Sequence, residues 1–292
     1  MRSCAITALA AALLLPAPGA VACAQGPAPR AGDEYEIVVR YETSERGSDG
    51  FEGTAHGSDA LLERVLAVRA DGVELEYDLP GDATAEQRAA VWQFPARVLQ
   101  PAGGAMLLLN GAELEARVDR WLAAAGWTRA VCGRWIFTWN AFRIECDPQS
   151  VLATIGALDL RSVDLREEAL YRDSGARAPG ALARLQDGGA GARFRVVLAV
   201  DPDAVRRERA QSDVATGEIM QTPVTLEEAL RRRAQERVTG TIEFLFETDS
   251  EGRVLKRTRV ARVVIEVPGG RSETRTATQT VERRRLPDRA TP

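Results

Sequence analysis

The clearest pattern in the chain is a regular alternation of apolar and polar residues. In residues 34–42 the odd positions are apolar and the even positions are mostly charged. Residues 73–79 alternate as strictly, and in residues 194–200 every even position is apolar. Because successive side chains of a β-strand point to opposite faces, this period of two predicts strands with one buried and one solvated face.

The last third of the chain predicts a meander of long strands. A strand around residues 242–246 is followed by a turn at 249–252, a returning strand over 253–267, a turn at 268–270 and a final strand over 271–285. The turns are too short for parallel crossovers, so the strands are expected to be antiparallel. Both faces of the final strand are polar, which leads us to expect it at an edge of the sheet.

Helix-start signals interrupt the strands. Capping boxes or an N-terminal cap followed by proline or glutamate predict short helices that begin after Thr84, Asn110, Asp147, Asp201 and Thr225. The last of these is expected to cover residues 226–237.

The fold class that follows is α+β. We expect a mainly antiparallel sheet of long strands, curved or half-barrel in shape, with about four short helices packed on it. Residues 33–286 are expected to form this single domain, with a weak internal boundary near residues 173–192, where glycine and alanine accumulate. Residues 25–32 read as a linker and residues 287–292 as a loose tail.

The N-terminus has the order of a secretory signal. A basic start, an apolar run and the small residues before Gln25 predict a signal peptide over residues 1–24, and hence a periplasmic protein. The apolar run is shorter than the roughly 20 residues that span a membrane, and no later segment qualifies. The alternative is a lipoprotein signal, in which Cys23 becomes the lipid anchor.

Two of the four cysteines, Cys132 and Cys146, remain after the signal is removed. Their aromatic-rich neighbours predict a hairpin in which Phe137 faces Ala141, and the same register places the two cysteines opposite each other. In an exported protein this pair predicts a disulfide, worth on the order of 3 kcal/mol. A redox-active or metal-binding pair is the alternative, but the spacing is not C-x-x-C and no histidine is near.

Composition narrows the possible chemistry. Lys256 is the one lysine and His56 the one histidine, which excludes phosphate-binding loops that need a placed lysine and metal centres built on several histidines. The net charge of −4, together with export, argues against nucleic-acid binding, although residues 225–292 are basic on balance. We predict no catalytic, cofactor-binding or metal-ligating residue.

His56 and two short segments have features of functional sites. His56 lies beside Ser58 and Asp59, but catalytic triads are assembled from separate segments, so a surface histidine is the preferred interpretation. Residues 247–252 resemble the start of a calcium loop but lack its twelfth-position glutamate, so a turn is preferred. The basic run at 256–262 alternates between two strand faces, which indicates solvated side chains rather than one binding patch.

Acidic and aromatic residues leave further options open. Carboxylate pairs such as Glu74 with Glu76, or Asp33 with Glu34, keep a glycosidase-like hydrolase possible. The tryptophans lie in the middle of the chain and predict an aromatic core around the disulfide, with a sugar- or lipid-binding groove as the alternative. They are Trp92, Trp121, Trp127, Trp135 and Trp139, of which Trp139 is expected to be the most exposed.

Several strings resemble uncharacterised exported proteins of proteobacteria. They are residues 126–151, 74–80 and 92–97. At fold level the chain also resembles periplasmic lipoprotein carriers, whose long antiparallel strands curl into a half-barrel with helices on the concave face. The resemblance implies no activity. The leading hypothesis is an exported envelope protein, not an enzyme, that binds a partner or an apolar ligand on its curved sheet; a carboxylate-dependent hydrolase of an envelope polymer is the alternative.

Overall fold

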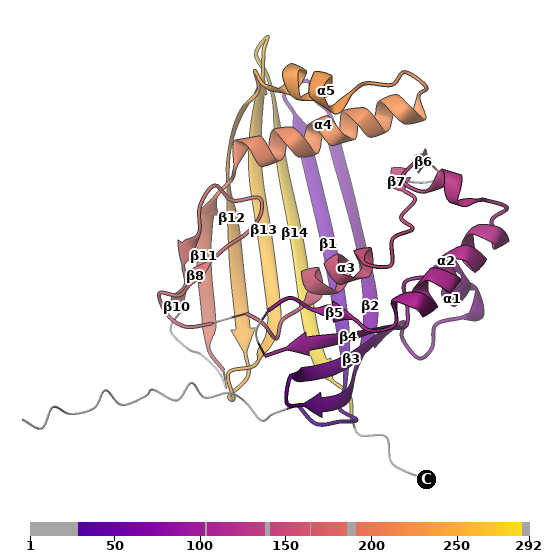
Figure 1. Ribbon diagram of the computed structural model, residues 1–292. Helices are drawn as coiled ribbons and strands as arrows, with labels where there is room; N and C mark the ends of the chain where they lie inside the picture. The colour runs from indigo at the N-terminus through magenta and orange to yellow at the C-terminus, as the bar shows by residue number, and fades with distance from the viewer. Residues whose placement is uncertain (1–28, 103, 138–140, 164, 186–190, 288–292) are drawn as a thin grey trace, which may run out of the picture.

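The computed structural model describes residues 29–102, 104–137, 141–163, 165–185 and 191–287. Figure 1 shows a wide sheet with helices on one side. The expected signal peptide, with Cys23, lies outside the described residues, as does Trp139. Within the part of the chain that the structure describes, no helix has the length and apolar character needed to cross a membrane.

Ten strands form one open antiparallel sheet. In sheet order they are β10 (Ala183–Leu185), β11 (Arg193–Ala199), β12 (Arg237–Thr248), β13 (Val254–Val267), β14 (Arg271–Arg285), β1 (Glu34–Gly47), β2 (Glu52–Arg69), β3 (Gly72–Asp78), β4 (Ala96–Pro101) and β5 (Leu107–Leu108). Both edge strands, β10 and β5, are very short, which limits pairing with other chains. The predicted fold class is confirmed.

The position of β14 corrects a prediction. It was expected at an edge because both its faces are polar, but it lies in the centre, between β13 and β1. Its pairing with β1 runs from Tyr35 opposite Arg285 to Gly47 opposite Glu273. The polar side chains of one face form ion pairs with other elements, as described below, and so do not mark an edge.

Five α-helices are present among the described residues. They are α1 (Ala85–Ala90), α2 (Gly111–Ala124), α3 (Ser150–Leu158), α4 (Pro202–Ile219) and α5 (Leu226–Arg233). The predicted capping boxes at Thr84 and Thr225 are both formed. The helix predicted over 226–237 is shorter than expected, because the chain leaves α5 after Arg233 and enters β12 at Arg237.

The helices α3 and α4 lie over the same face of the sheet, with α4 and α5 crossing one end of the strands (Figure 1). We call this face, which carries Ile37, Phe244 and Val281, the inner face. The other is the outer face. Away from α4, the inner face forms the main core with α2 and α3, and its aliphatic and aromatic side chains are almost fully buried. Tyr171, from the short strand β8 (Leu170–Tyr171) paired with β9 (Gly180–Ala181), packs on Phe244 and Phe246 at ring distances of 4.7 and 5.2 Å.

One charged cluster lies inside this core. Glu63 on β2 is 1% exposed and accepts hydrogen bonds from Arg283 on β14 at 2.8 Å, from Arg161, and from the Tyr77 hydroxyl at 3.3 Å. The Arg283 guanidinium also lies 3.3 Å from the centre of the Tyr35 ring. Burial raises the pKa of Glu63, but the charges and hydrogen bonds of Arg161 and Arg283 outweigh burial, so its pKa is below the usual range. Glu63 therefore stays ionised and joins three parts of the chain.

The disulfide hairpin has the predicted register. Phe137 at the end of β6 (Trp135–Phe137) is opposite Ala141 at the start of β7 (Ala141–Arg143). Cys132 and Cys146 form a disulfide with a Cα–Cα distance of 5.7 Å. The predicted pairing is confirmed, and the nearby rings of Trp121 and Trp127 pack edge to face at 5.8 Å.

Replacing Cys132 and Cys146 together with alanine is expected to lower the free energy of unfolding by about 3 kcal/mol, because the unfolded chain gains freedom when the crosslink is removed. Urea unfolding with and without reductant measures this. Reductant should lower the stability of the unmodified protein and leave that of the double variant unchanged. Free thiols at Cys132 and Cys146 in the denatured, unreduced protein would contradict the assignment.

Replacing Glu63 with glutamine is expected to lower the free energy of unfolding by about 3–5 kcal/mol, because two largely buried guanidinium groups lose their counter-charge. Glu282→Gln is the matched control. It removes a carboxylate that pairs with Arg40 and Lys256 at the surface, and it should cost no more than about 1 kcal/mol.

Acid unfolding gives a second readout for Glu63. Its folded-state pKa is lowered, so its stabilising effect is complete above the unfolded value of about 4.5 and is lost as the pH falls through the folded value. The unmodified protein should therefore lose stability more steeply below pH 4.5 than Glu63→Gln does. Equal slopes would show that Glu63 is not the ionised centre of the cluster.

Candidate functional site

Small side chains gather on the inner face beside α4. The strand register places Ala261 of β13 opposite Ala277 of β14, Ala277 opposite Thr43 of β1, and Thr43 opposite Ala55 of β2. Since all four positions share one face, they form a row of short side chains across four neighbouring strands. Because these side chains are short, they do not fill the distance between the sheet and α4, and a space remains there.

This space is a cavity of about 380 Å³, which is within the range of small-molecule sites. Apolar side chains are the larger group among its lining residues, although polar atoms contribute about half of the exposed wall. The apolar side chains come from α4, from the end of β11 and from the inner face, and they are Val200, Ala204, Val205, Ile242, Ala261, Val263, Ile265 and Ala277. We call it the apolar cavity.

Arginines border the apolar cavity. Arg259 lies at one side, where its guanidinium is 3.2 Å from the carboxylate of Asp173 and 5.8 Å from the centre of the Phe244 ring. Arg209 and Arg275 lie at the other side, with Glu208. The cavity thus has apolar lining side chains and charged side chains at its border, which suits a ligand with an apolar part and a charged part.

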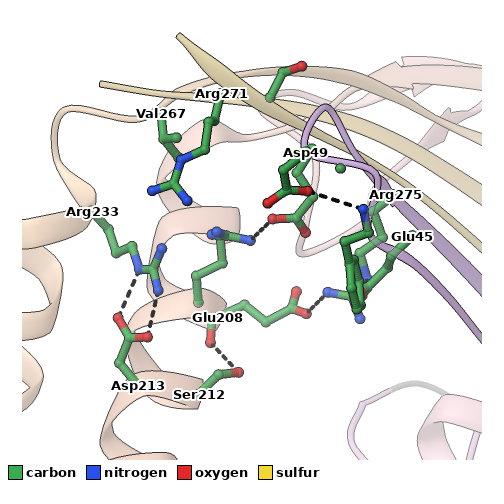
Figure 2. A pocket seen from close by; sticks show the side chains of 14 residues that line it. Glu45, Asp49, Glu208, Ser212, Asp213, Arg233, Val267, Arg271 and Arg275 are labelled. Atoms are coloured by element: carbon green, nitrogen blue, oxygen red, sulfur yellow. Dashed lines mark hydrogen bonds and ion pairs between the residues drawn. The ribbon is translucent and has the colours of Figure 1, made fainter. Parts of the chain in front are cut away.

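A second hollow, of about 590 Å³, shares Glu208, Arg209 and Arg275 with the apolar cavity. Charged and hydroxyl side chains from α4, α5 and the strand turns line it (Figure 2). We call it the polar hollow. Because the two spaces have three residues in common, they adjoin each other at the ion pairs that hold α4 to the sheet.

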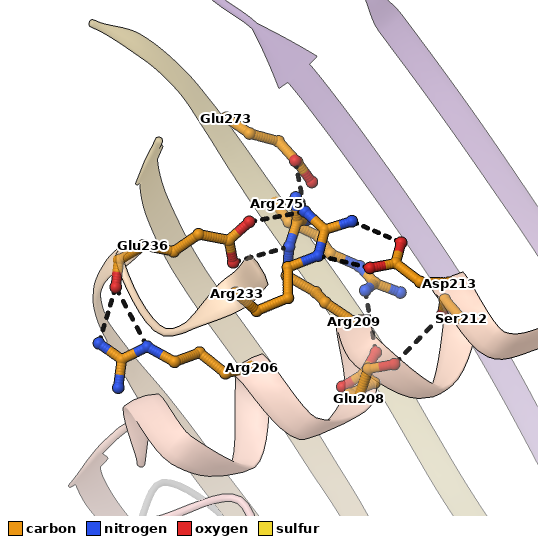
Figure 3. A network of polar contacts seen from close by, with 9 residues as sticks. All are labelled: Arg206, Glu208, Arg209, Ser212, Asp213, Arg233, Glu236, Glu273 and Arg275. Atoms are coloured by element: carbon orange, nitrogen blue, oxygen red, sulfur yellow. Dashed lines mark hydrogen bonds and ion pairs between the residues drawn. The ribbon is translucent and has the colours of Figure 1, made fainter. Parts of the chain in front are cut away.

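These ion pairs form a network (Figure 3). Arg209 of α4 donates to Glu273 of β14 at 2.9 Å and lies 3.2 Å from Glu236. Arg275 of β14 donates to Glu208 of α4 at 3.0 Å and lies 3.1 Å from Glu45 of β1. Charges of opposite sign on helix and strand therefore hold α4 across the sheet through polar contacts, beside a cavity that apolar packing does not fill.

The same network fixes α5. Arg233 makes two hydrogen bonds to Asp213 of α4, at 2.8 and 2.6 Å, and one to Glu236 at 2.6 Å. The hydrogen bonds to Asp213, and then those to Glu236, raise the pKa of Arg233 above its usual range despite partial burial. Glu236 is buried, and its backbone carbonyl accepts from Arg206. The two helices are therefore attached to the sheet as one unit.

The histidine that the sequence singled out does not belong to this site. His56 is exposed and lies opposite Glu42, on the outer face of the sheet. Residues 247–248 end β12, and residues 249–252 lie in the turn to β13, where Asp249 accepts hydrogen bonds from the backbone N–H groups of Glu251 and Arg253, so the predicted turn is present. Among the described residues, no group of histidine, cysteine and carboxylate side chains is arranged to hold a metal ion.

The predicted carboxylate pairs are engaged by arginines. Glu74 pairs with Arg69, Glu76 and Glu34 both pair with Arg64, and Asp33 pairs with Arg285. A general acid of glycosidase type needs a raised pKa. Among the described residues, four carboxyl groups have a shifted pKa, and in each of them the pKa is lowered. They are Glu63, Glu228, Asp249 and Glu282. A lowered pKa keeps a carboxyl group ionised, so none of these four suits the role of a general acid.

The basic run at 256–262 is split between the two faces, as predicted. On the inner face, however, Arg257 donates to the carbonyl of Ala157 at the end of α3, and Arg259 binds Asp173. These two arginines are therefore partly buried, and they connect β13 to α3 and to the segment that contains Asp173.

Sequence reasoning missed Arg209, Arg233 and Arg275. One signal could have found the last of them. The odd positions of the final strand pass from Glu273 and Arg275 through Ala277 to the buried Val281, so charged residues continue an apolar face. Such a change along one face indicates that the charged end meets charges on another element.

Comparisons with known proteins identify no family. No protein-family model matches the chain, and no curated protein does. Among solved structures, lipovitellin is similar with 8% identity and a TM-score of 0.40, over 90% of this chain and 26% of that one. An outer membrane channel from Pseudomonas putida F1 is similar with 8% identity and a TM-score of 0.22, over 92% of this chain and all of that one. Scores this low carry no argument about function.

Proposed function

We propose that this protein binds an amphiphile, with the apolar chain in the apolar cavity and the charged head in the polar hollow. The observation that carries the proposal is the junction of the two spaces at Glu208, Arg209 and Arg275. Burying an apolar chain is favourable by about 25 cal/mol per Å² removed from water, while a charged head left in an apolar site is costly. A site with one space of each kind meets both demands.

The row of small side chains extends the apolar cavity. Thr43 and Ala55 continue it across β1 and β2, where the inner face is solvent-accessible and Tyr41 is 44% exposed. A chain longer than the cavity has a path along this row, perpendicular to the strands. Neighbouring strands lie about 4.8 Å apart, so a row across four strands spans roughly 15 Å between its end strands.

The cellular location is part of the proposal. The disulfide is of the kind that persists in oxidising compartments. Together with the signal expected over residues 1–24 and the resemblance to exported proteins, it supports a protein of the cell envelope, where amphiphiles are the natural ligands.

Binding is tested first with N-phenylnaphthylamine, an apolar fluorophore whose emission rises in apolar surroundings. Ala277→Phe is expected to weaken its binding by about tenfold or more, because the added ring occupies the floor of the cavity. Thr278→Phe is the matched control, since it adds similar bulk to the next residue of β14, on the outer face. Fluorescence titration measures both, and thermal unfolding checks that both variants are folded.

Native mass spectrometry gives an independent test. Protein purified from an envelope fraction without detergent should carry a co-purifying amphiphile, and Ala277→Phe should not. An unmodified protein that neither carries an amphiphile nor binds the fluorophore would overturn the proposed function.

A further inference from the structure

The ion-pair network leaves two charges of the polar hollow without an ionic partner. Four arginines and five carboxylates line the hollow. Arg209, Arg233 and Arg275 each pair with at least one carboxylate, as described above. Within the described residues, Arg271 and Asp49 are the lining charges that form no ion pair.

Arg271 and Asp49 reach the hollow from neighbouring strand ends. Arg271 is the first residue of β14, directly after the β13–β14 turn, and it is exposed. Asp49 lies in the turn between β1 and β2, and its Oδ1 atom accepts a hydrogen bond from the backbone N–H of Phe51 at 3.2 Å. Figure 2 shows both side chains directed into the hollow, facing the α4 and α5 side chains.

The charge balance restricts the head group. A plain anion bound at Arg271 would also meet a lining with more carboxylates than arginines. A plain cation bound at Asp49 would leave Arg271 without a counter-charge. A zwitterion satisfies both groups, since its anionic part accepts from the guanidinium and its ammonium donates to the carboxylate.

We infer that the polar hollow recognises a head group that carries both a phosphate and a primary ammonium, as in ethanolamine phospholipids. This inference rests on the proposed function, because the acyl chain of the same molecule would occupy the adjoining apolar cavity. Arg271 binds the phosphate by a planar, two-pronged contact, and Asp49 accepts from the N–H donors of the ammonium. A choline head offers no N–H donor, and a glycerol head offers no positive charge.

The experiment measures displacement of N-phenylnaphthylamine by short-chain phospholipids below their micellar concentration. Phosphatidylethanolamine is expected to bind about tenfold more tightly than phosphatidylglycerol or phosphatidylcholine, because its ammonium adds a charge-assisted hydrogen bond to Asp49 that the other two head groups cannot make. Free phosphoethanolamine distinguishes the lipid from a soluble phosphate ester and is expected not to displace the fluorophore.

Two variants and one control locate the effect. Asp49→Asn keeps the Oδ1 acceptor for Phe51 but removes the charge, so it should abolish the preference for phosphatidylethanolamine and leave the affinity for phosphatidylglycerol undiminished. Arg271→Ala should lower the affinity for phosphatidylethanolamine and for phosphatidylglycerol by about tenfold each, because both lipids carry the phosphate. Arg262→Ala is the control, because Arg262 is likewise exposed but lies on the outer face of β13, and it should change neither affinity.

The outcomes separate the two proposals. If the fluorophore binds but the three lipids displace it equally, or if Asp49→Asn and Arg271→Ala behave like Arg262→Ala, the head-group inference is wrong and amphiphile binding stands. If free phosphoethanolamine binds as tightly as the lipid in calorimetry, the ligand is a soluble phosphate ester and the lipid assignment is overturned. If neither fluorophore nor lipid binds, the proposed function itself fails.

Discussion

The pairing of the first strand with the last is the constraint on which the rest of the structure depends. β1 begins a meander that continues through β2 to β5, and β14 ends one that begins with β10. The β1–β14 ladder joins these two meanders into one sheet, from Tyr35 opposite Arg285 to Gly47 opposite Glu273. Without it, neither meander could complete the inner face that forms the core at one end and the candidate site at the other.

Ion pairs lie at both ends of this ladder, and they have different structural roles. At the core end, Glu63 of β2 binds Arg283 of β14 across β1, in a cluster that is almost fully buried. At the other end, Arg275 joins Glu45 of β1 and Glu208 of α4 in a half-exposed network. The first cluster holds the strands rigidly together. The second attaches a helix over a cavity, and since it is reached by water, competing charges of a ligand can act on it.

Much of the local structure could be predicted from the residues alone. The alternation in residues 34–42 and the meander from β12 to β14 were found because a strand with one buried face shows its period in about eight residues. The hairpin register and the Cys132–Cys146 disulfide followed from the same short-range geometry. The place of β14 was predicted wrongly. A polar face looks alike whether it meets water or the charges of a distant helix, and the partners of Glu273 and Arg275 lie on α4 and β1.

The sequence by itself therefore determined the type of the long, periodic strands and of the capped helices, the register of the cysteine hairpin, the disulfide and the α+β class. The tertiary structure decided the order of the two meanders and the position of α4. It also decided which arginines, carboxylates and small side chains meet at one site. The physical reason is range. Periodicity, capping and turn chemistry act between residues a few positions apart, whereas Ala261, Ala277, Thr43 and Ala55 form a row only after the chain ends have paired.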